Sequence, residues 1–156
     1  DKVTLKIEQT PLPQRIFRWL LTALAIAAIT ALLLASLMYV YYQLRAKQAN
    51  EKARLYWLYR LALLTLNQLG FQRILKTPLE YAQYTIDPKF GTQFAQFMQI
   101  YHKNKYAPQG LQPEDHAFVQ QFVGQFKDKV FGKYKWWEIL RNFLNPVPTL
   151  RFLFSR

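Results

Sequence analysis

The residues of this chain that could take part in catalysis are few. His102 and His116 are its only imidazoles, and it contains no cysteine. Thiolate nucleophiles, disulfides and cysteine-based metal sites are therefore excluded from this sequence. Nucleophilic catalysis also needs a base beside an activated Ser or Thr, and neither histidine lies in a recognisable motif of that kind. We predict that this chain is not itself an enzyme.

Metal ions and phosphate groups also have no clear site in the sequence. His116 follows Glu114 and Asp115, but consecutive residues of a helix point in different directions. The two acids are better explained as charges in the first turn of a helix. The five glycines are scattered and form no phosphate-binding loop. We predict no metal site and no cofactor.

The composition favours a folded, basic protein with an anionic partner. The 156 residues are 51% hydrophobic and 17% aromatic, which is too apolar for a disordered tail, and the formal net charge is +12. Such a balance suits nucleic acid, anionic lipid headgroups or an acidic protein.

One segment has the composition of a transmembrane helix. No charged residue occurs between Arg18 and Arg45, and most of that stretch is Leu, Ala and Ile. About 20 apolar helical residues cross a hydrocarbon layer of about 30 Å. Trp19 at one end and the tyrosines within residues 39–42 at the other are side chains that prefer the two membrane interfaces. We predict a single transmembrane helix over residues 19–42.

Basic residues flank this segment on both sides. Those on the leading side are Lys2, Lys6, Arg15 and Arg18, and those on the trailing side are Arg45, Lys47, Lys52, Arg54 and Arg60. Because Lys and Arg near a span are enriched on its cytoplasmic side, we expect the trailing side in the cytoplasm. Residues 1–18 are then an extracytoplasmic linker or terminal strand, since Val3 to Glu8 alternate apolar and polar side chains.

The basic run directly after the span has two interpretations. Its members are Arg45, Lys47, Lys52 and Arg54. Near an anionic membrane surface each such residue can gain about 1 kcal/mol from lipid headgroups. The alternative is that they are ordinary stop-transfer charges that set the orientation of the span.

Residues 43–132 have the pattern of a helical domain. The absence of Gly and Pro from Gln43 to Leu69 predicts that the transmembrane helix runs on to Gly70. Thr77-Pro78-Leu-Glu80 predicts a capped helix start, and that helix should end before Pro88. Two apolar stripes at helical spacing follow, Phe90, Phe94, Phe97, Met98 and Tyr101, then Phe118, Val119, Phe122, Val123, Phe126 and Val130. The fold class predicted is all-α, a single transmembrane helix followed by a small bundle of four or five short helices.

The tail, residues 133–156, is basic and aromatic. We predict a short helix from Trp136 to Leu144 that Asn145-Pro146 ends. Trp136 and Trp137 stand among Lys and Arg, which suits a helix lying in the membrane interface, where the two tryptophans would contact headgroups. The alternative is that these aromatic side chains pack onto the core of the domain.

Three local patterns together resemble a known family. They are Tyr59-Arg60 with Leu69-Gly-Phe-Gln-Arg73, then Thr77-Pro78-Leu-Glu80-Tyr81-Ala82, then Ile100-Tyr101-His-Lys-Asn-Lys-Tyr106. In these patterns the chain resembles the C-terminal part of bacterial transglutaminase-like membrane proteins of the TgpA type, over about residues 22–131. The resemblance implies a last membrane span and a cytoplasmic helical domain of unknown function. The Cys, His and Asp triad of that family belongs to a preceding extracytoplasmic domain, so no catalytic residue is carried over.

The motif residues themselves have a structural and a functional interpretation. Thr77, Pro78 and Glu80 start a helix. Tyr81, Tyr101 and Tyr106 are expected as core aromatics whose hydroxyls reach a partner group. The alternative is that these tyrosines line a groove that binds another protein.

We therefore expect a non-catalytic, membrane-anchored module whose helical domain positions a larger protein and recruits an unknown cytoplasmic protein. The bilayer, with its anionic headgroups, is the other expected partner. The alternative is a membrane-tethered module that binds nucleic acid through its +12 charge.

Overall fold

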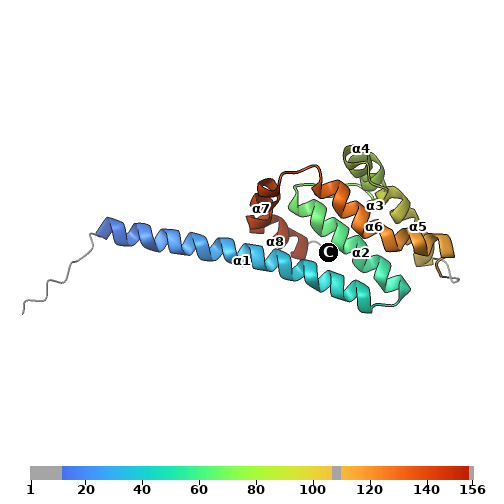
Figure 1. Cartoon of the computed structure of the whole chain (residues 1–156), viewed down its shortest axis with the longest axis horizontal. Coiled ribbons are helices and arrows are strands. Elements are labelled where there is room, and N and C mark those ends of the chain that lie inside the picture. The colour runs from blue at the N-terminus through green and yellow to red at the C-terminus, as the bar shows by residue number, and fades with distance from the viewer. Residues whose placement is uncertain (1–11, 107–109, 155–156) are drawn as a thin grey trace, which may run out of the picture.

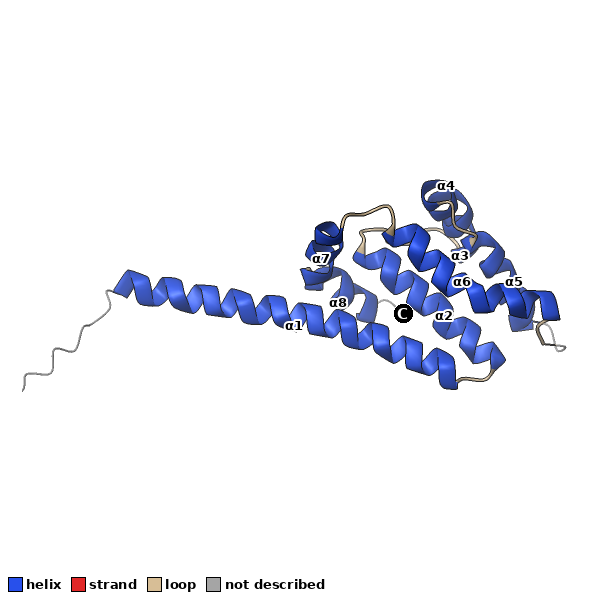
Figure 2. Cartoon of the chain, in the orientation of Figure 1, coloured by secondary structure: helices blue, strands red, loops and turns tan. Residues whose placement is uncertain are grey.

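The structure is a computed structural model and describes residues 12–106 and 110–154. Its described part is all-α without strands, as predicted, and one long apolar helix leads into a bundle of shorter ones (Figures 1 and 2). The helices are α1 (Leu12–Gln48), α2 (Glu51–Gln68), α3 (Pro78–Tyr81), η1 (Ala82–Ile86), α4 (Asp87–Phe90), α5 (Phe94–Tyr106), α6 (Pro113–Phe131), α7 (Trp136–Leu144) and α8 (Pro146–Phe154). The strand-like segment expected over residues 3–8 lies outside the described residues.

The first two helices form an antiparallel hairpin, which corrects the prediction of one helix running on to Gly70. α1 ends at Gln48, and Asn50 caps α2 by accepting a hydrogen bond from the Ala53 amide at 3.0 Å. Asn is among the best N-cap residues, and Glu51 follows it in the positively polarised first turn. These two local signals outweigh the absence of Gly and Pro. Gly70, with φ +88°, follows the end of α2 as predicted.

The section of α1 that packs on the bundle buries several small side chains. The buried residues of α1 form a single stripe, Ala31, Ala35, Met38, Tyr42 and Ala46. Alanine at three of these positions lets neighbouring helices approach the backbone of α1 closely, as small residues do between packed helices. α2 therefore lies along the second half of α1 (Figure 1).

An aromatic core joins α5 and α6, as their apolar stripes predicted. Phe97 and Phe122 stack with their ring centroids 4.4 Å apart and an interplanar angle of 11°. Phe94 contacts Phe126 at 5.4 Å and is itself fully buried. Stacked aromatic pairs of this kind add to the free energy gained from burying their surface.

The helix that starts at Thr77 does not end before Pro88, so that prediction was wrong. The chain passes through the π-helical turn η1 into α4, which has Pro88 in its first turn. An α-helical turn would press the proline ring against the carbonyl four residues earlier, and the wider π turn relieves that contact. The helical path therefore continues past Pro88 to Phe90. Gly91, which adopts the left-handed conformation with φ +64°, ends α4.

Asp87 gains a role from this geometry, because its carboxylate caps the next helix. Its Oδ1 accepts hydrogen bonds from the Thr92 hydroxyl at 2.5 Å and the Phe94 amide at 2.8 Å. Its Oδ2 accepts from the Ala95 amide at 2.9 Å. These two amides belong to the first turn of α5, which would otherwise leave them without partners.

Replacing Asp87 by Ala is expected to destabilise the bundle by about 2 kcal/mol, because two amides and a hydroxyl lose a charged acceptor. Thermal unfolding in detergent, followed by near-ultraviolet circular dichroism, measures the effect. Asp128→Ala is the control, since Asp128 is exposed on α6 and should change stability by less than about 0.5 kcal/mol. Equal unfolding temperatures for the two variants would contradict the capping role.

The tail contains a helix that the sequence analysis missed. α7 follows the predicted bounds, but the chain continues as α8 with Pro146 and Pro148 near its start. Proline is tolerated there because first-turn amides have no intrahelical partner. Phe152 of α8 is buried in a cluster with Met38 and Tyr42 of α1 and Leu61 of α2. The tail is thus fixed to the α1–α2 hairpin.

Candidate membrane-binding surface

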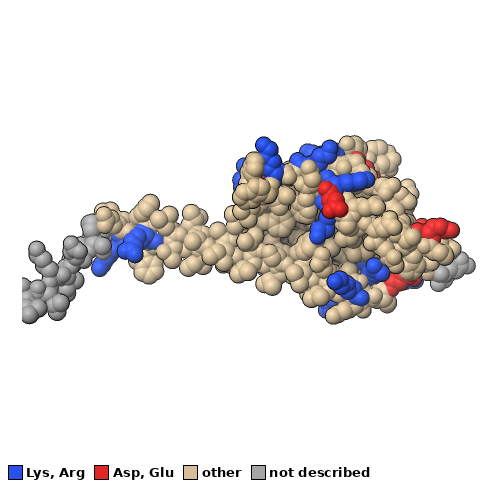
Figure 3. Space-filling model, in the orientation of Figure 1, with Lys and Arg blue, Asp and Glu red and all other residues tan. Residues whose placement is uncertain are grey.

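α1 has two sections with different surroundings. From Leu12 to Thr30 no side chain is buried, and the large apolar residues there are 50% exposed or more. From Ala31 to Ala46 the helix carries the buried stripe that packs on the bundle. Figure 3 shows the free section as an uncharged stretch between basic side chains near its N-terminal end and the charged surface of the bundle. α1 is the one helix in the described residues that is long and apolar enough to cross a membrane.

The free section of α1 is shorter than the hydrocarbon layer of a bilayer is thick, so a bilayer crossed by α1 would also contact helices that pack on it. At 1.5 Å per residue, the 12 residues from Trp19 to Thr30 span only about 18 Å. Adding Leu12–Arg18, whose two arginines could reach the interface, gives about 28 Å. A hydrocarbon layer of about 30 Å crossed by α1 therefore reaches the level of Ala31 in either case. Helices packed beside that level would touch lipid.

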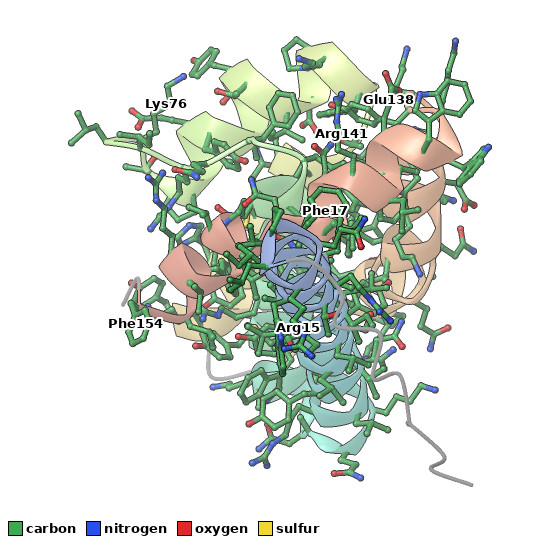
Figure 4. All side chains as sticks on the ribbon, turned by 90° about the vertical axis from the view of Figure 1, so that its left-hand side faces the viewer. Arg15, Phe17, Lys76, Glu138, Arg141 and Phe154 are labelled. Carbon is green, nitrogen blue, oxygen red and sulfur yellow. The ribbon has the colours of Figure 1, made fainter. Side chains whose placement is uncertain are left out.

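α7 and α8 lie at that level. Both pack against α1 near its middle (Figure 1). Figure 4 looks along α1 from its N-terminal end, with Arg15 and Phe17 in front and Glu138, Arg141 and Phe154 placed around the helix. Large apolar side chains stay exposed on the two helices, Trp136, Trp137, Leu140, Val147, Leu150, Leu153 and Phe154. We call α7 and α8 together the membrane-proximal face.

The two tail tryptophans are exposed, which is contrary to the alternative that they pack onto the core of the domain. Trp136 is 72% exposed and Trp137 is 50% exposed, so they do not pack into the core. α7 contains no buried residue at all. Phe143, in contrast, is half-buried and lies 6.4 Å from Phe131. Contact of the two tryptophans with lipid remains a prediction.

The basic run that was a candidate for headgroup contact is divided between two helices. Arg45 and Lys47 lie on the last turns of α1, about 5 and 8 Å beyond Tyr42. The Arg45 Nε donates to the Tyr41 hydroxyl at 3.2 Å. Lys52 and Arg54 begin α2 at the end of the hairpin. Their contact with lipid stays a prediction.

The capping box predicted at the family motif is confirmed. The Thr77 hydroxyl accepts from the Glu80 amide at 3.3 Å, the Thr77 amide donates to Glu80 Oε2 at 2.9 Å, and Pro78 occupies the first turn. Hydrogen bonds from the Thr77 amide and hydroxyl lower the pKa of Glu80. The ionised Glu80 carboxylate therefore stabilises the fold at pH values above the ordinary pKa of a glutamate. This stabilisation is lost as the pH falls through the lowered pKa of Glu80.

The three motif tyrosines have three different environments. Tyr81 is 1% exposed and its hydroxyl donates to the Phe71 carbonyl at 2.5 Å, as a core aromatic should. Burial raises the pKa of Tyr81 and that of Tyr59. Tyr101 is half-buried and stacks on Tyr59 with centroids 5.7 Å apart. Tyr106 is 75% exposed, so the expectation of a core position was wrong for it. A protein partner could reach Tyr106 and the open side of Tyr101.

The two histidines have different neighbours. His116 of α6 pairs with Glu51 at the start of α2, and Asp115 of α6 pairs with Lys103 of α5 at 3.2 Å. His102 contacts the ring of Tyr101. Within residues 12–106 and 110–154 no group of three His, Asp or Glu side chains could hold a metal ion.

Comparisons of the chain with protein-family models, with curated proteins and with solved structures found no match. The resemblance to TgpA-type proteins therefore stays a prediction that depends on the motif residues alone.

The structure also brings together three arginines from distant parts of the sequence. Arg60 of α2, Arg73 of the segment after Gly70, and Arg151 of α8 line one cavity of about 340 Å³. The sequence held no signal for this, because Arg60 and Arg151 meet only through the packing of α8 against α2.

Proposed function

We propose that this chain is a non-catalytic, membrane-anchored interaction and positioning module. α1 crosses the bilayer once, and the bundle lies on the cytoplasmic side with α7 and α8 against the lipid, where it recruits another protein. The observation that supports this best is the free section of α1, whose leucines and isoleucines would expose a long apolar surface to water. Lipid removes that cost.

Positioning follows from how the span joins the bundle. α1 is continuous from the free section into the packed section, so no flexible linker separates them. The buried stripe of α1 and the cluster around Phe152 fix the bundle to the helix. A movement or rotation of the span would therefore be transmitted to the bundle as a rigid body.

The parent protein in this proposal is a transglutaminase-like membrane protein of the TgpA type. The support is the Thr77–Glu80 capping box together with the tyrosine pattern from Tyr59 to Tyr106. In such a protein the catalytic domain precedes α1 on the other side of the membrane, and this chain holds it at a fixed height above the bilayer.

The test is the topology of single-cysteine variants. Because the chain contains no cysteine, Gln14→Cys at the start of α1 and Gln125→Cys on the exposed surface of α6 each introduce one reactive thiol. A membrane-impermeant maleimide is expected to label the Gln14→Cys variant in intact cells. It should label the Gln125→Cys variant only after the cells are lysed.

Two results would contradict the proposal. Labelling of both variants in intact cells would place both ends of α1 outside. Release of the chain from membranes by alkaline carbonate would show that α1 does not cross the bilayer.

A further inference from the structure

The cavity with the three arginines lies between α2 from Tyr56 to Asn67, the segment 71–74 and α8. Aromatic side chains form much of its wall, Tyr56, Tyr59, Phe71 and Phe152. No carboxylate lines it. In the described part of the chain, the ion pairs within 4.0 Å involve other residues, so Arg60, Arg73 and Arg151 have no acidic partner.

Arg60 is the fixed member of the group. Its Nη2 donates to the Tyr42 hydroxyl at 3.3 Å, and its guanidinium carbon lies 4.3 Å from the ring centroid of Phe152. The Nε of Arg60 is buried and has no hydrogen-bond partner. A buried, unpaired donor on a charged group is costly, and an anion in the cavity would satisfy it.

The depth of Arg60 relative to the predicted span is set by Tyr42. Along α1, Tyr42 lies about 35 Å from Trp19, slightly more than the thickness of a hydrocarbon layer. With Trp19 at one interface, Tyr42 and the Arg60 bonded to it lie at the headgroup level of the other. α8 forms part of both the cavity wall and the membrane-proximal face, so the two surfaces are continuous.

We propose that this cavity binds the phosphate of an anionic phospholipid in the leaflet that surrounds the bundle. Three guanidiniums supply the planar, forked donors that suit phosphate oxygens, and the aromatic wall borders the glycerol end of the headgroup. The charge of the cavity and the position of Arg60 at the level of Tyr42 both favour lipid. This inference depends on the proposed membrane insertion of α1.

The test compares lipids retained by the full chain after release from nanodiscs that contain equal amounts of phosphatidylglycerol and phosphatidylcholine. Native mass spectrometry counts the bound lipids. The unmodified chain is expected to retain phosphatidylglycerol preferentially. Arg60→Gln is expected to lower that preference by about fivefold, and Arg73→Gln with Arg151→Gln by more, since each arginine near an anionic surface contributes a comparable gain.

Matched controls separate a site from general charge. Lys105→Gln, alone and with Lys129→Gln, removes the same charge at exposed positions outside the cavity and should leave the preference unchanged. Arg60→Lys keeps the charge but loses the fork, so it should retain only part of the preference. If the Arg60→Gln variant does not fold, the variant with Arg73→Gln and Arg151→Gln still tests the cavity, because both of these arginines are exposed.

Several outcomes would overturn the inference. An inserted chain that retains both lipids equally, or arginine variants that match the lysine controls, would show that the cavity is not a lipid site while leaving the proposed function intact. Tight binding of inorganic phosphate in lipid-free micelles, or of an acidic peptide that displaces no lipid, would assign the cavity to a soluble anion. A chain that does not enter nanodiscs at all would overturn the proposed function as well.

Discussion

Arginine in place of both Ala25 and Ile29 is expected to abolish stable insertion of the chain into membranes. Both positions lie on the free section of α1, where their side chains are exposed. An arginine near the centre of a membrane helix costs about 3 kcal/mol on insertion scales, so two cost about 6 kcal/mol, or more than a 10⁴-fold change in the insertion equilibrium. The double variant should be lost from the alkaline carbonate pellet, whereas the unmodified chain should remain in it.

The control for this experiment adds the same charge elsewhere. Gln99→Arg with Gln121→Arg places two arginines at exposed positions of α5 and α6. This variant should stay in the membrane pellet, because its new charges face water. If the α1 variant is retained equally well, the helix does not lie in hydrocarbon, and the proposed anchor is wrong.

The parts of the fold that could be predicted are those with local signals. Thr77, Pro78 and Glu80 act on neighbouring backbone groups within four residues, so the helix start was visible in the sequence. The stripes of α5 and α6 were visible because aromatic residues at helical spacing must be buried somewhere. The N-cap signal of Asn50 is equally local, but the residues around it all favour helix and hide the break between α1 and α2.

The parts that could not be predicted depend on contacts between distant segments. Asp87 caps α5 only because the chain passes through η1 and turns at Gly91. The expectation that a helix ends before a proline did not predict this path. Asn67 donates to the Pro148 carbonyl at 2.6 Å, a contact between residues 81 positions apart that helps to hold α8 in place. The arginine cavity exists because of that packing. A candidate site of this kind has no sequence motif, because its members share no element.

The rigid joint between span and bundle gives the lipid inference a consequence for function. The bundle is fixed at Tyr42 through Arg60 and Phe152, so an anion held at Arg60 would stabilise the same contacts that set the height of the bundle. Ligands that bind only the folded, docked arrangement favour it by mass action. Anionic lipid and the orientation of the span are therefore expected to support each other.

The largest loss of stability in the bundle is expected from Phe97→Ala. Phe97 is fully buried, stacks on Phe122 at 4.4 Å and lies 6.3 Å from Phe94, so its loss leaves a cavity lined by rings that cannot collapse easily. Replacement of a buried Phe by Ala costs about 4 kcal/mol. For a bundle of this size the thermal midpoint should fall by about 15 °C.

Near-ultraviolet circular dichroism of the purified chain in detergent micelles measures this midpoint, because the signal comes from aromatic rings held in fixed packing. Tyr106→Ala is the matched control, since it removes an aromatic ring from the same helix at a position that is 75% exposed. It should shift the midpoint by no more than about 2 °C. Similar shifts for both variants would mean that the α5–α6 aromatic stack does not form the core of the bundle. An unfolded Phe97→Ala bundle that still pellets with membranes would show that insertion depends on α1 and stability on the stack.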